Sequence, residues 1–557
     1  MRNRRLIATA AVIAAGVGLV PGMAHAADPV KPTKSVKPDT HEVEIAPDLT
    51  KAAAHNFATF QSPAERTVQT SPGAKAAAPQ GQGLAGSQPS VSLKGRGTSA
   101  HGISLAATVT SDPGTPLGVY VEWGDGTTNQ IGANGPETVT LDHTYAKVGH
   151  YKITVSLVDS SGTRAVNEMD VWTPGSDFTP HTPTRLLDTR EGTGAPKGKV
   201  PASGTARVQI EGNSGIPANV TAVVLNVTVT NATGTGYVTA FGDGDAKPDS
   251  SNLNYNAGQT VPNLVIVPVG SNGYVNLFNY GGSVDLVADV TGYFTRTSSS
   301  GYTPLTPNRL VDTRSGLGAR QGQVPGLGTF GVQVHGRGGV PSSAKAVALN
   351  VTVTEPRSNG FLSVFPGGQQ ASATSNLNFT TGQTVANAVI VPIGSDGKIS
   401  VRNGSWNPAD VIVDVVGYYS PDSQSAYLPV LPERLLDTRG DAHWNYGPLE
   451  DFEYAYMPLG YGRPNETSWV LNTTVTNTTN SGWLGVAPDP NSLDAYKNQY
   501  AVWPPTPASS TLNWTRGKVV PNLVQATGGP DGIVDLFNQS YGSTHLVVDI
   551  FGYYDKS

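Results

Sequence analysis

The sequence contains no cysteine in 557 residues. Disulfide bonds, thiolate metal sites and cysteine nucleophiles are therefore excluded together, and the stability of any exported domain must come from its core. Charged side chains are also scarce, at 14% of the chain against about 25% in an average soluble protein. Because Glu, Lys and Arg usually cover helix surfaces, this shortage disfavours a helical or α/β enzyme.

The sequence also has no excess of basic over acidic residues. The 36 basic and 42 acidic residues leave a net charge of -6. Such a chain has no cationic field for a phosphate backbone. We therefore expect no nucleic-acid partner.

Residues that favour turns and β-strands are abundant in the sequence. The chain has 65 glycines and 42 prolines, with frequent Val, Thr and Asn. These residues suit tight turns and half-buried pleated surfaces. The length allows about three to five domains. We predict an all-β fold with several domains.

The N-terminus has the layout of a signal peptide over residues 1–26. Basic residues are followed by an apolar run from Leu6 to Val20 and by a small-x-small site at Ala24-His-Ala26. We expect cleavage after Ala26. Arg4-Arg5 leaves the twin-arginine route open, although we favour general secretion. The apolar run is shorter than a bilayer requires, and no later stretch reaches about 20 apolar residues. We therefore expect no membrane span after cleavage. We expect an extracellular protein that is either free or bound noncovalently to a cell wall.

Residues 27–88 are rich in Pro, Ala, Lys and Gln and contain few large apolar residues. Such a segment buries too little surface to offset its ordering entropy. We predict a disordered linker, with a short helix near residues 49–60 as an open alternative.

Alternating apolar and polar residues begin after the linker and predict a β-sandwich over residues 89–174. The Gly124-Asp-Gly126 segment predicts a hairpin turn. We interpret Asp125 as a turn residue rather than a calcium ligand, and His143 and Tyr145 as packing residues.

Several motifs in this region resemble the polycystic-kidney-disease (PKD) domain. They are Trp123-Gly-Asp-Gly126, His143-Thr-Tyr145 and the segment from Gly149 to Val155. The resemblance implies an immunoglobulin-like sandwich that serves outside the cell as a spacer or as a module for protein or polysaccharide contacts. It implies no catalysis.

The rest of the chain contains three copies of one unit. Arg185-Leu-Leu-Asp-Thr-Arg190 recurs at Arg309 and Arg434, at steps of 124 and 125 residues, and the same blocks follow each time. A period of this length indicates an autonomous domain, and the strand and turn signals predict a β-sandwich or jelly roll. The third copy carries about 13 extra residues as a projecting insertion near 485–510. The three predicted domains span residues 178–297, 301–421 and 426–557.

These units resemble a module of secreted actinobacterial proteins in which RLLDTR repeats occur in tandem. The resemblance implies an extracellular role at a cell surface or on a polymer. It supplies no activity.

Charged residues recur at fixed places in every copy. The Asp of each RLLDTR segment and the Asp near the end of each copy could form the carboxylate pair of a glycosidase. We favour an ion pair that closes the first strand, because each RLLDTR Asp lies between two arginines. The recurring structural residues are Arg185, Asp188, Arg190, Asp289, Arg309, Asp312, Arg314, Asp414, Arg434, Asp437, Arg439 and Asp549.

Motifs of catalysis and metal binding are absent from the sequence. No histidine recurs across the copies, and no HExxH, GxSxG or P-loop segment occurs. Linker, sandwich and repeats leave no segment for a separate enzyme domain. We predict a protein that is not an enzyme and has no catalytic residue, cofactor or metal.

Aromatic residues gather in the third copy, which holds five of the eight tryptophans. Trp469 and Trp514 replace apolar residues of the other copies, so we expect them to pack in the core. The divergent segments 440–461 and 487–507 have no apolar counterparts, and rings there are candidates for an exposed sugar-stacking platform. The candidate ligand-binding residues are Trp444, Trp503, Tyr496 and Tyr500.

Asparagines such as Asn226, Asn254 and Asn263 also recur. We expect them to satisfy backbone groups at turns and edges rather than to bind a sugar. The sequence therefore predicts a secreted, non-enzymatic adhesion protein that binds a carbohydrate or cell-envelope polymer through repeated weak sites. The alternatives are a structural or protein-binding surface protein without glycan affinity and a divergent glycoside hydrolase.

Overall fold

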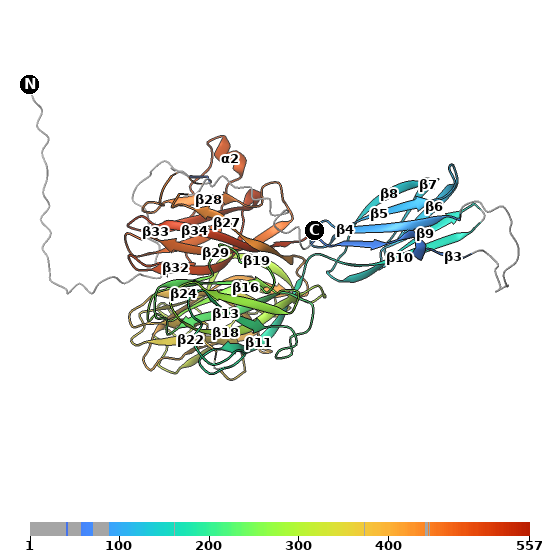
Figure 1. Ribbon diagram of the computed structural model, residues 1–557. Helices are drawn as coiled ribbons and strands as arrows, with labels where there is room; N and C mark the ends of the chain where they lie inside the picture. Colours follow the sequence, from blue (N-terminus) through green and yellow to red (C-terminus); the bar gives the residue numbers. More distant parts are fainter. Residues whose placement is uncertain are drawn as a thin grey trace, which may run out of the picture.

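A computed structural model describes residues 41–42, 57–70, 88–160, 162–371, 374–440, 444 and 446–557. Nearly all regular structure in these residues is antiparallel sheet, which confirms the predicted all-β, multidomain sandwich fold. A smaller sandwich, coloured blue to cyan, lies at one end of a larger body (Figure 1). No helix among the described residues is long and apolar enough to cross a membrane. The predicted signal peptide at 1–26 lies outside the described residues.

The first sandwich packs two sheets, of order β2-β4-β5-β8 and β3-β10-β9-β6-β7, around Trp123 and Tyr145. The Tyr145 hydroxyl donates to Trp123 O at 3.0 Å, and Asp125 accepts from Thr127 N at 2.9 Å within the predicted turn. The strands are β2 (Thr59–Ser62), β3 (Val68–Thr70), β4 (Ser90–Gly97), β5 (Gly102–Thr110), β6 (Pro116–Glu122), β7 (Thr128–Asn134), β8 (Glu137–Thr144), β9 (His150–Asp159) and β10 (Arg164–Trp172).

Strands β2 and β3 correct the predicted linker over 27–88. They pair with β4 and β10, and buried Ser62 donates to Asn167 Oδ1 at 2.7 Å. The helix considered near 49–60 is wrong at its described end, where strand begins at Thr59. Pairing with a formed sheet decides the conformation of such edge segments, and their own composition gives little signal of it.

Each of the three copies consists of two sheets around its own core. In copy one an inner sheet β11-β18-β13-β16 packs on an outer sheet β12-β17-β14-β15. Its strands are β11 (Asp177–Asp188), β12 (Gly204–Gln209), β13 (Val220–Thr230), β14 (Gly236–Gly242), β15 (Leu253–Tyr255), β16 (Val261–Pro268), β17 (Tyr274–Asn279) and β18 (Asp285–Thr295).

Copies two and three repeat this plan. In copy three, β1 (His41–Glu42) extends the outer sheet by pairing parallel to β28, and α2 lies in the insertion between β30 and β31. Copy two has β19 (Gly301–Asp312), β20 (Thr329–Gln333), β21 (Ala346–Thr354), β22 (Gly360–Pro366), β23 (Leu377–Phe379), β24 (Val385–Pro392), β25 (Lys398–Asn403) and β26 (Asp410–Ser420). Copy three has β27 (Ala426–Asp437), β28 (Tyr454–Pro458), β29 (Glu466–Thr476), β30 (Gly482–Pro488), α2 (Leu493–Lys497), β31 (Leu512–Trp514), β32 (Val520–Thr527), β33 (Ile533–Ser540) and β34 (His545–Asp555).

The copies share one further core, so they are not separate units. Along β16, Val265 and Val267 enter the core of copy one, whereas Leu264 and Ile266 enter an axial core built by all three copies. This explains why the apolar run has no alternation, since both faces of the strand are buried. One end of the axial core is aromatic and consists of Phe178, Phe294, Tyr302, Tyr419, Tyr427 and Tyr554.

Six buried asparagines close the copies into a ring beside the axial core. Asn226 donates to Ser375 O of copy two at 2.6 Å, Asn350 to Ser510 O of copy three at 2.5 Å, and Asn472 to Ser251 O of copy one at 2.8 Å. A second set, Asn263, Asn387 and Asn522, donates to the first set at 3.0 to 3.1 Å. The contacts therefore run cyclically from one copy to the next, with approximate threefold symmetry.

The first sandwich contacts the body at the aromatic end of this axis. Ala100 N donates to Asp555 Oδ2 at 3.1 Å, and His101 N donates to Ser557 O at 2.7 Å. The C-terminus accordingly lies at the junction in Figure 1. The opposite end of the body is left uncovered by the first sandwich.

Candidate functional site

The RLLDTR charges form ion pairs inside each copy. Arg185 faces Asp289 across β11 and β18, with Nε 2.9 Å from Asp289 Oδ1 and Nη1 3.1 Å from Asp188 Oδ2. Arg190 donates to both oxygens of Asp188. Burial raises the pKa of Asp289, and the bond from Arg190 lowers the pKa of Asp188. Both oxygens of Asp188 are occupied by arginines, an arrangement suited to closing a strand rather than to proton transfer.

The same contacts recur in the other two copies. Arg309 Nε lies 3.0 Å from Asp414, and Arg434 Nε lies 2.5 Å from Asp549. The RLLDTR carboxylates Asp312 and Asp437 each meet two arginines, which are Arg309 and Arg314 for the first and Arg434 and Arg439 for the second.

Trp444 is not part of an exposed platform, and that prediction is wrong for this residue. Its side chain is 2% exposed and belongs to the core of copy three, where Nε1 donates to Gly447 O at 2.6 Å. The divergent segment that carries it turns inward and supplies its own apolar residue. A lack of counterparts in the other copies therefore did not imply exposure.

The other three candidate rings lie on the insertion of copy three. Tyr496 is half-buried, stacks on Tyr456 with ring centroids 3.9 Å apart, and donates its hydroxyl to Asp489. Tyr500 is exposed, and Trp503 is 40% exposed. Tyr496 therefore packs beneath the surface of the insertion, whereas Tyr500 and Trp503 are exposed on that surface.

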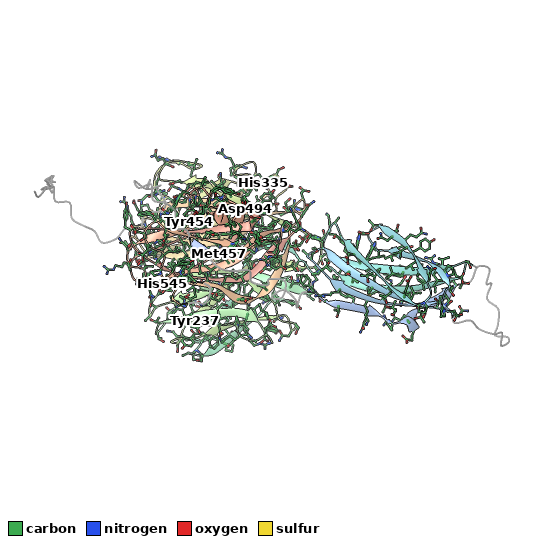
Figure 2. All side chains as sticks on the ribbon, turned by 90° about the horizontal axis from the view of Figure 1, so that it is seen from above. Tyr237, His335, Tyr454, Met457, Asp494 and His545 are labelled. Carbon is green, nitrogen blue, oxygen red and sulfur yellow. The ribbon has the colours of Figure 1, made fainter. Side chains whose placement is uncertain are left out.

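Hydrogen bonds fix the insertion in place. Asn491 accepts from Val502 N and donates to Val502 O, both at 2.8 Å, so it fixes the residue before Trp503. The Trp503 ring meets the Tyr454 ring edge to face, 5.0 Å between centroids. Helix α2 begins at its N-cap Ser492, which accepts from Ala495 N. Figure 2 shows Tyr454 and Asp494, which lies in α2, on the body formed by the three copies. We call Tyr500, Val502 and Trp503 the platform.

Two buried carboxyl groups lie beneath the platform, and the sequence analysis did not single them out. Asp489 accepts from Asn491 N at 2.6 Å, while Asp535 is fully buried and neither of its side-chain oxygens accepts a hydrogen bond from a described residue. Burial, together with neighbouring Asp489, raises the pKa of Asp535 to about 10. In copy one the equivalent pair is Asp243 and Asn276, joined at 2.8 Å. Alignment of the copies could have shown this Asn-to-Asp difference.

The change Asp535→Asn should increase the free energy of unfolding at pH 7 by about 4 kcal/mol, because an amide needs no proton to approach Asp489. The folded pKa near 10 exceeds the ordinary value of 3.8. The contribution of the protonated Asp535 side chain to the free energy of unfolding of the wild-type protein is therefore complete below pH 4. It is lost as the pH rises toward 10. Urea denaturation from pH 4 to pH 9 measures the difference between the two proteins.

The reverse change in copy one, Asn276→Asp, serves as the matched control and should lower stability at neutral pH. If the difference in the free energy of unfolding between wild type and Asp535→Asn does not vary from pH 4 to pH 9, Asp535 is ionised in the folded protein over this range and the prediction is wrong.

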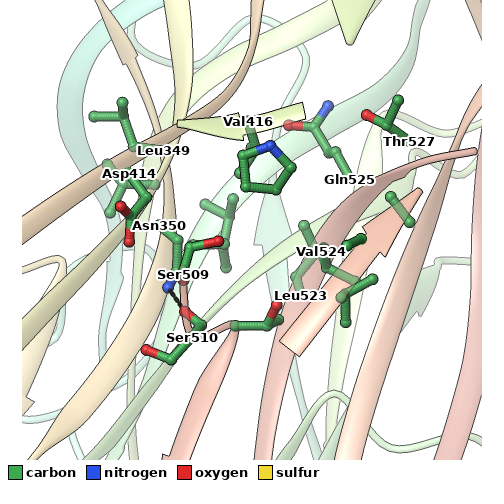
Figure 3. Close-up of a pocket in the computed structure, with 18 of the residues that line it drawn as sticks. Leu349, Asn350, Asp414, Val416, Ser509, Ser510, Leu523, Val524, Gln525 and Thr527 are labelled. Atoms are coloured by element: carbon green, nitrogen blue, oxygen red, sulfur yellow. Dashed lines mark hydrogen bonds between the residues drawn. The ribbon is translucent and has the colours of Figure 1, made fainter. Parts of the chain in front are cut away.

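Two cavities are formed where the copies meet. One, between copies two and three, has a volume of only about 30 Å³ and includes the bond from Asn350 to Ser510 O (Figure 3). The other, which we call the axial pocket, has a volume of about 710 Å³ and opens at the end of the axis away from the aromatic cluster. Turns from all three copies line it, at 256–260, 378–384 and 513–520. Its lining is mainly Asn, Gln, Thr and Gly, with Lys518 as the charged residue.

Within the part of the chain that the structure describes, no group of three or more His, Asp or Glu residues could hold a metal ion. No protein-family model matches the chain, and no curated protein matches it.

Two solved structures are weakly similar to the chain. One is described as "Structural basis for the promiscuous specificity of the carbohydrate-binding modules from the beta-sandwich super family"; it is 12% identical, with 37% of this chain and 99% of that chain covered and a TM-score of 0.17. The other, the Sulfolobus turreted icosahedral virus, is 8% identical, with 68% and 90% covered and a TM-score of 0.14. Scores this low carry no argument about function.

Proposed function

We propose that the protein is a secreted, non-enzymatic adhesion protein that binds a neutral polysaccharide through the platform. The observation that carries the proposal is the fixed exposure of Tyr500 and Trp503 on the insertion of copy three. A pyranose ring presents an apolar face of C–H groups that stacks on an aromatic ring, and a ring already held in place loses little entropy on binding. Tyr500 also donates to Asp494 at 2.5 Å, which orients its ring before any ligand arrives.

Export by residues 1–26, an extracellular or wall-associated location and a PKD-like spacer role for the first sandwich belong to the same proposal. They are supported by the sequence motifs described above. A structural or protein-binding role without glycan affinity is the rival hypothesis, and a divergent glycoside hydrolase is the third.

The change Trp503→Ala should weaken retention of the mature protein on its polysaccharide about tenfold, the loss expected for one stacked ring. The measurement is a pull-down on insoluble chitin, cellulose and peptidoglycan with the chain from residue 27 to 557. Because the Trp503 ring also contacts the Tyr454 ring, the thermal midpoint of the variant is measured as well, to confirm that it is folded.

Trp172→Ala provides a matched control, since Trp172 is also 40% exposed but lies in the first sandwich. Equal losses from both changes would contradict a specific platform. Failure to bind any of the three polymers would favour the protein-binding rival. Release of soluble sugar by the wild-type chain, abolished by Asp437→Asn, would overturn the non-enzymatic proposal.

A further inference from the structure

Each copy has one exposed aromatic ring in the turn that connects the same two strands, one of the outer sheet and one of the inner sheet. Tyr280 is 57% exposed in the turn between β17 and β18, Trp406 is 82% exposed between β25 and β26, and Tyr541 is 69% exposed between β33 and β34. We call these segments, residues 279–284, 403–409 and 538–544, the three aromatic turns. Rings this exposed contribute little to any core, so folding does not account for their recurrence.

A buried asparagine fixes each aromatic turn. The side-chain nitrogen of Asn403 donates to Val324 O at 3.1 Å, to Pro325 O at 3.2 Å and to Asn407 O at 3.0 Å. Asn279 and Asn538 donate in the same way to two carbonyls of the facing loop and to carbonyls of their own turn. The three turns are therefore built alike and are held before any ligand binds.

An aromatic neighbour contacts the exposed ring in copies one and three. Tyr237 stacks on Tyr280 with centroids 4.6 Å apart, and Phe452 meets Tyr541 edge to face at 4.9 Å. In copy two, Leu327 N donates to Ser405 O in the turn of Trp406. Leu327 and Phe452 both have φ near +58°, a conformation that costs a bulky residue about 1 to 2 kcal/mol. Ser203 of copy one has the same conformation, with φ +58°, so this turn of the facing loop recurs in all three copies whatever its side chain.

The three aromatic turns lie at the end of the body that bears the axial pocket. Gly360 lines the pocket, and a Cβ on it would lie 2.3 Å from Ser405 Cβ in the turn of copy two. In copy three, Asn480 accepts from Trp514, a pocket residue, and donates to Tyr541 O. Strand β13 runs from the aromatic end of the axis to this pocket. The turns therefore face away from the first sandwich.

The chemistry of this end favours a sugar over other ligands. The three aromatic turns contain no charged residue, and Gly, Ser and Asn are their commonest residues. A phosphate-bearing ligand would need cationic groups. A hydrophobic protein interface would need a continuous apolar patch of several hundred Å², whereas each turn presents one exposed ring flanked in the sequence by Gly, Ser or Asn.

We propose that the three aromatic turns are three equivalent sites for pyranose rings of a neutral polysaccharide, which bind the polymer at the end of the body remote from the first sandwich. The ligand class rests on the proposed function, but the site is distinct from the platform. Three weak sites on one rigid body bind a polymer about 10² times more tightly than a single site does, because the second and third contacts are intramolecular.

The test uses the mature chain carrying Trp503→Ala, which removes the platform from the measurement. Titration calorimetry with chitohexaose and with cellohexaose should give three sites per chain for the matching sugar. Each of Tyr280→Ala, Trp406→Ala and Tyr541→Ala should remove one site. The triple variant should lose all three and should be retained about 100-fold less on the corresponding insoluble polymer.

The matched control is Tyr120→Ala, an exposed tyrosine of the first sandwich, which should leave the three sites unchanged. Circular dichroism and the thermal midpoint of the triple variant confirm that it is folded. If the three changes, made in the chain that keeps Trp503, leave polymer retention unchanged while Trp503→Ala alone abolishes it, this inference is wrong and the proposed function stands. If the triple variant loses binding and Trp503→Ala has no effect, the turns bind and the platform does not. If the wild-type chain binds neither sugar nor polymer, both proposals fail.

Discussion

A chain that ends at residue 421, and so lacks copy three, is expected to aggregate when expressed, whereas the three-copy chain should be monomeric. Copy three contributes Tyr427, Val470, Leu523, Phe551 and Tyr554 to the axial core. Without it, the apolar faces of the inner sheets of copies one and two are open to water. An exposed apolar surface of this kind drives association.

Removal of copy three also leaves buried polar groups without partners. Asn350 loses Ser510 O, Ala388 N loses Asn522 Oδ1, and Asn263 loses Asn472 Oδ1. Unsatisfied groups of this kind cost about 1 to 3 kcal/mol each when they remain buried. The two remaining copies can therefore not keep their present arrangement.

Size-exclusion chromatography with light scattering would measure the expected association. The control is a chain that starts at residue 176, which lacks the first sandwich but keeps the closed ring, and should remain monomeric. A monomeric, soluble two-copy chain as stable as the three-copy chain would show that the copies are independent domains.

The sequence predicted the three-copy plan, but not its closure into a ring. Leu264 and Ile266 continue the apolar run of β16, and the same run would appear whether its second face met another sheet of the same copy or a neighbouring copy. The prediction that Asn226 satisfies a backbone group fits its bond to Ser375 O, yet that carbonyl belongs to the next copy. Side-chain type indicates the kind of partner, whereas only the tertiary structure identifies it.

The candidate site could be predicted in part. Tyr500 and Trp503 are on the surface, whereas Trp444 is inside, because a divergent segment has no repeat partner from which its burial could be judged. The aromatic turns escaped notice because Tyr280 follows its asparagine by one residue and Trp406 follows its asparagine by three. Because the two spacings differ by two residues, the rings do not align when the recurring motifs of the copies are aligned. They nevertheless lie in the same turn.

The change Asn387→Ala should lower the free energy of unfolding of the three-copy body by about 4 kcal/mol, because three buried groups each lose a hydrogen-bond partner. The Asn387 side chain donates to Asn226 Oδ1 at 3.1 Å and to Asn376 O at 2.6 Å, and it accepts from Leu264 N. It thus joins copy two to copy one. Alanine has no polar side-chain atom and would leave all three groups without this partner.

Urea denaturation followed by tryptophan fluorescence measures this loss, since Trp469 and Trp514 are buried in copy three and report on unfolding of the body. Asn378→Ala is the matched control, because Asn378 is a half-buried residue of the same copy that accepts one bond from Ser375 Oγ at 3.2 Å. Its expected cost is about 1 kcal/mol. Equal effects of the two changes would mean that the asparagine ring adds nothing beyond ordinary hydrogen bonds, and that the apolar axial core alone holds the copies together. A larger effect of Asn387→Ala, with copy three unfolding at lower urea although the change is in copy two, would show that the ring couples the stability of all three copies.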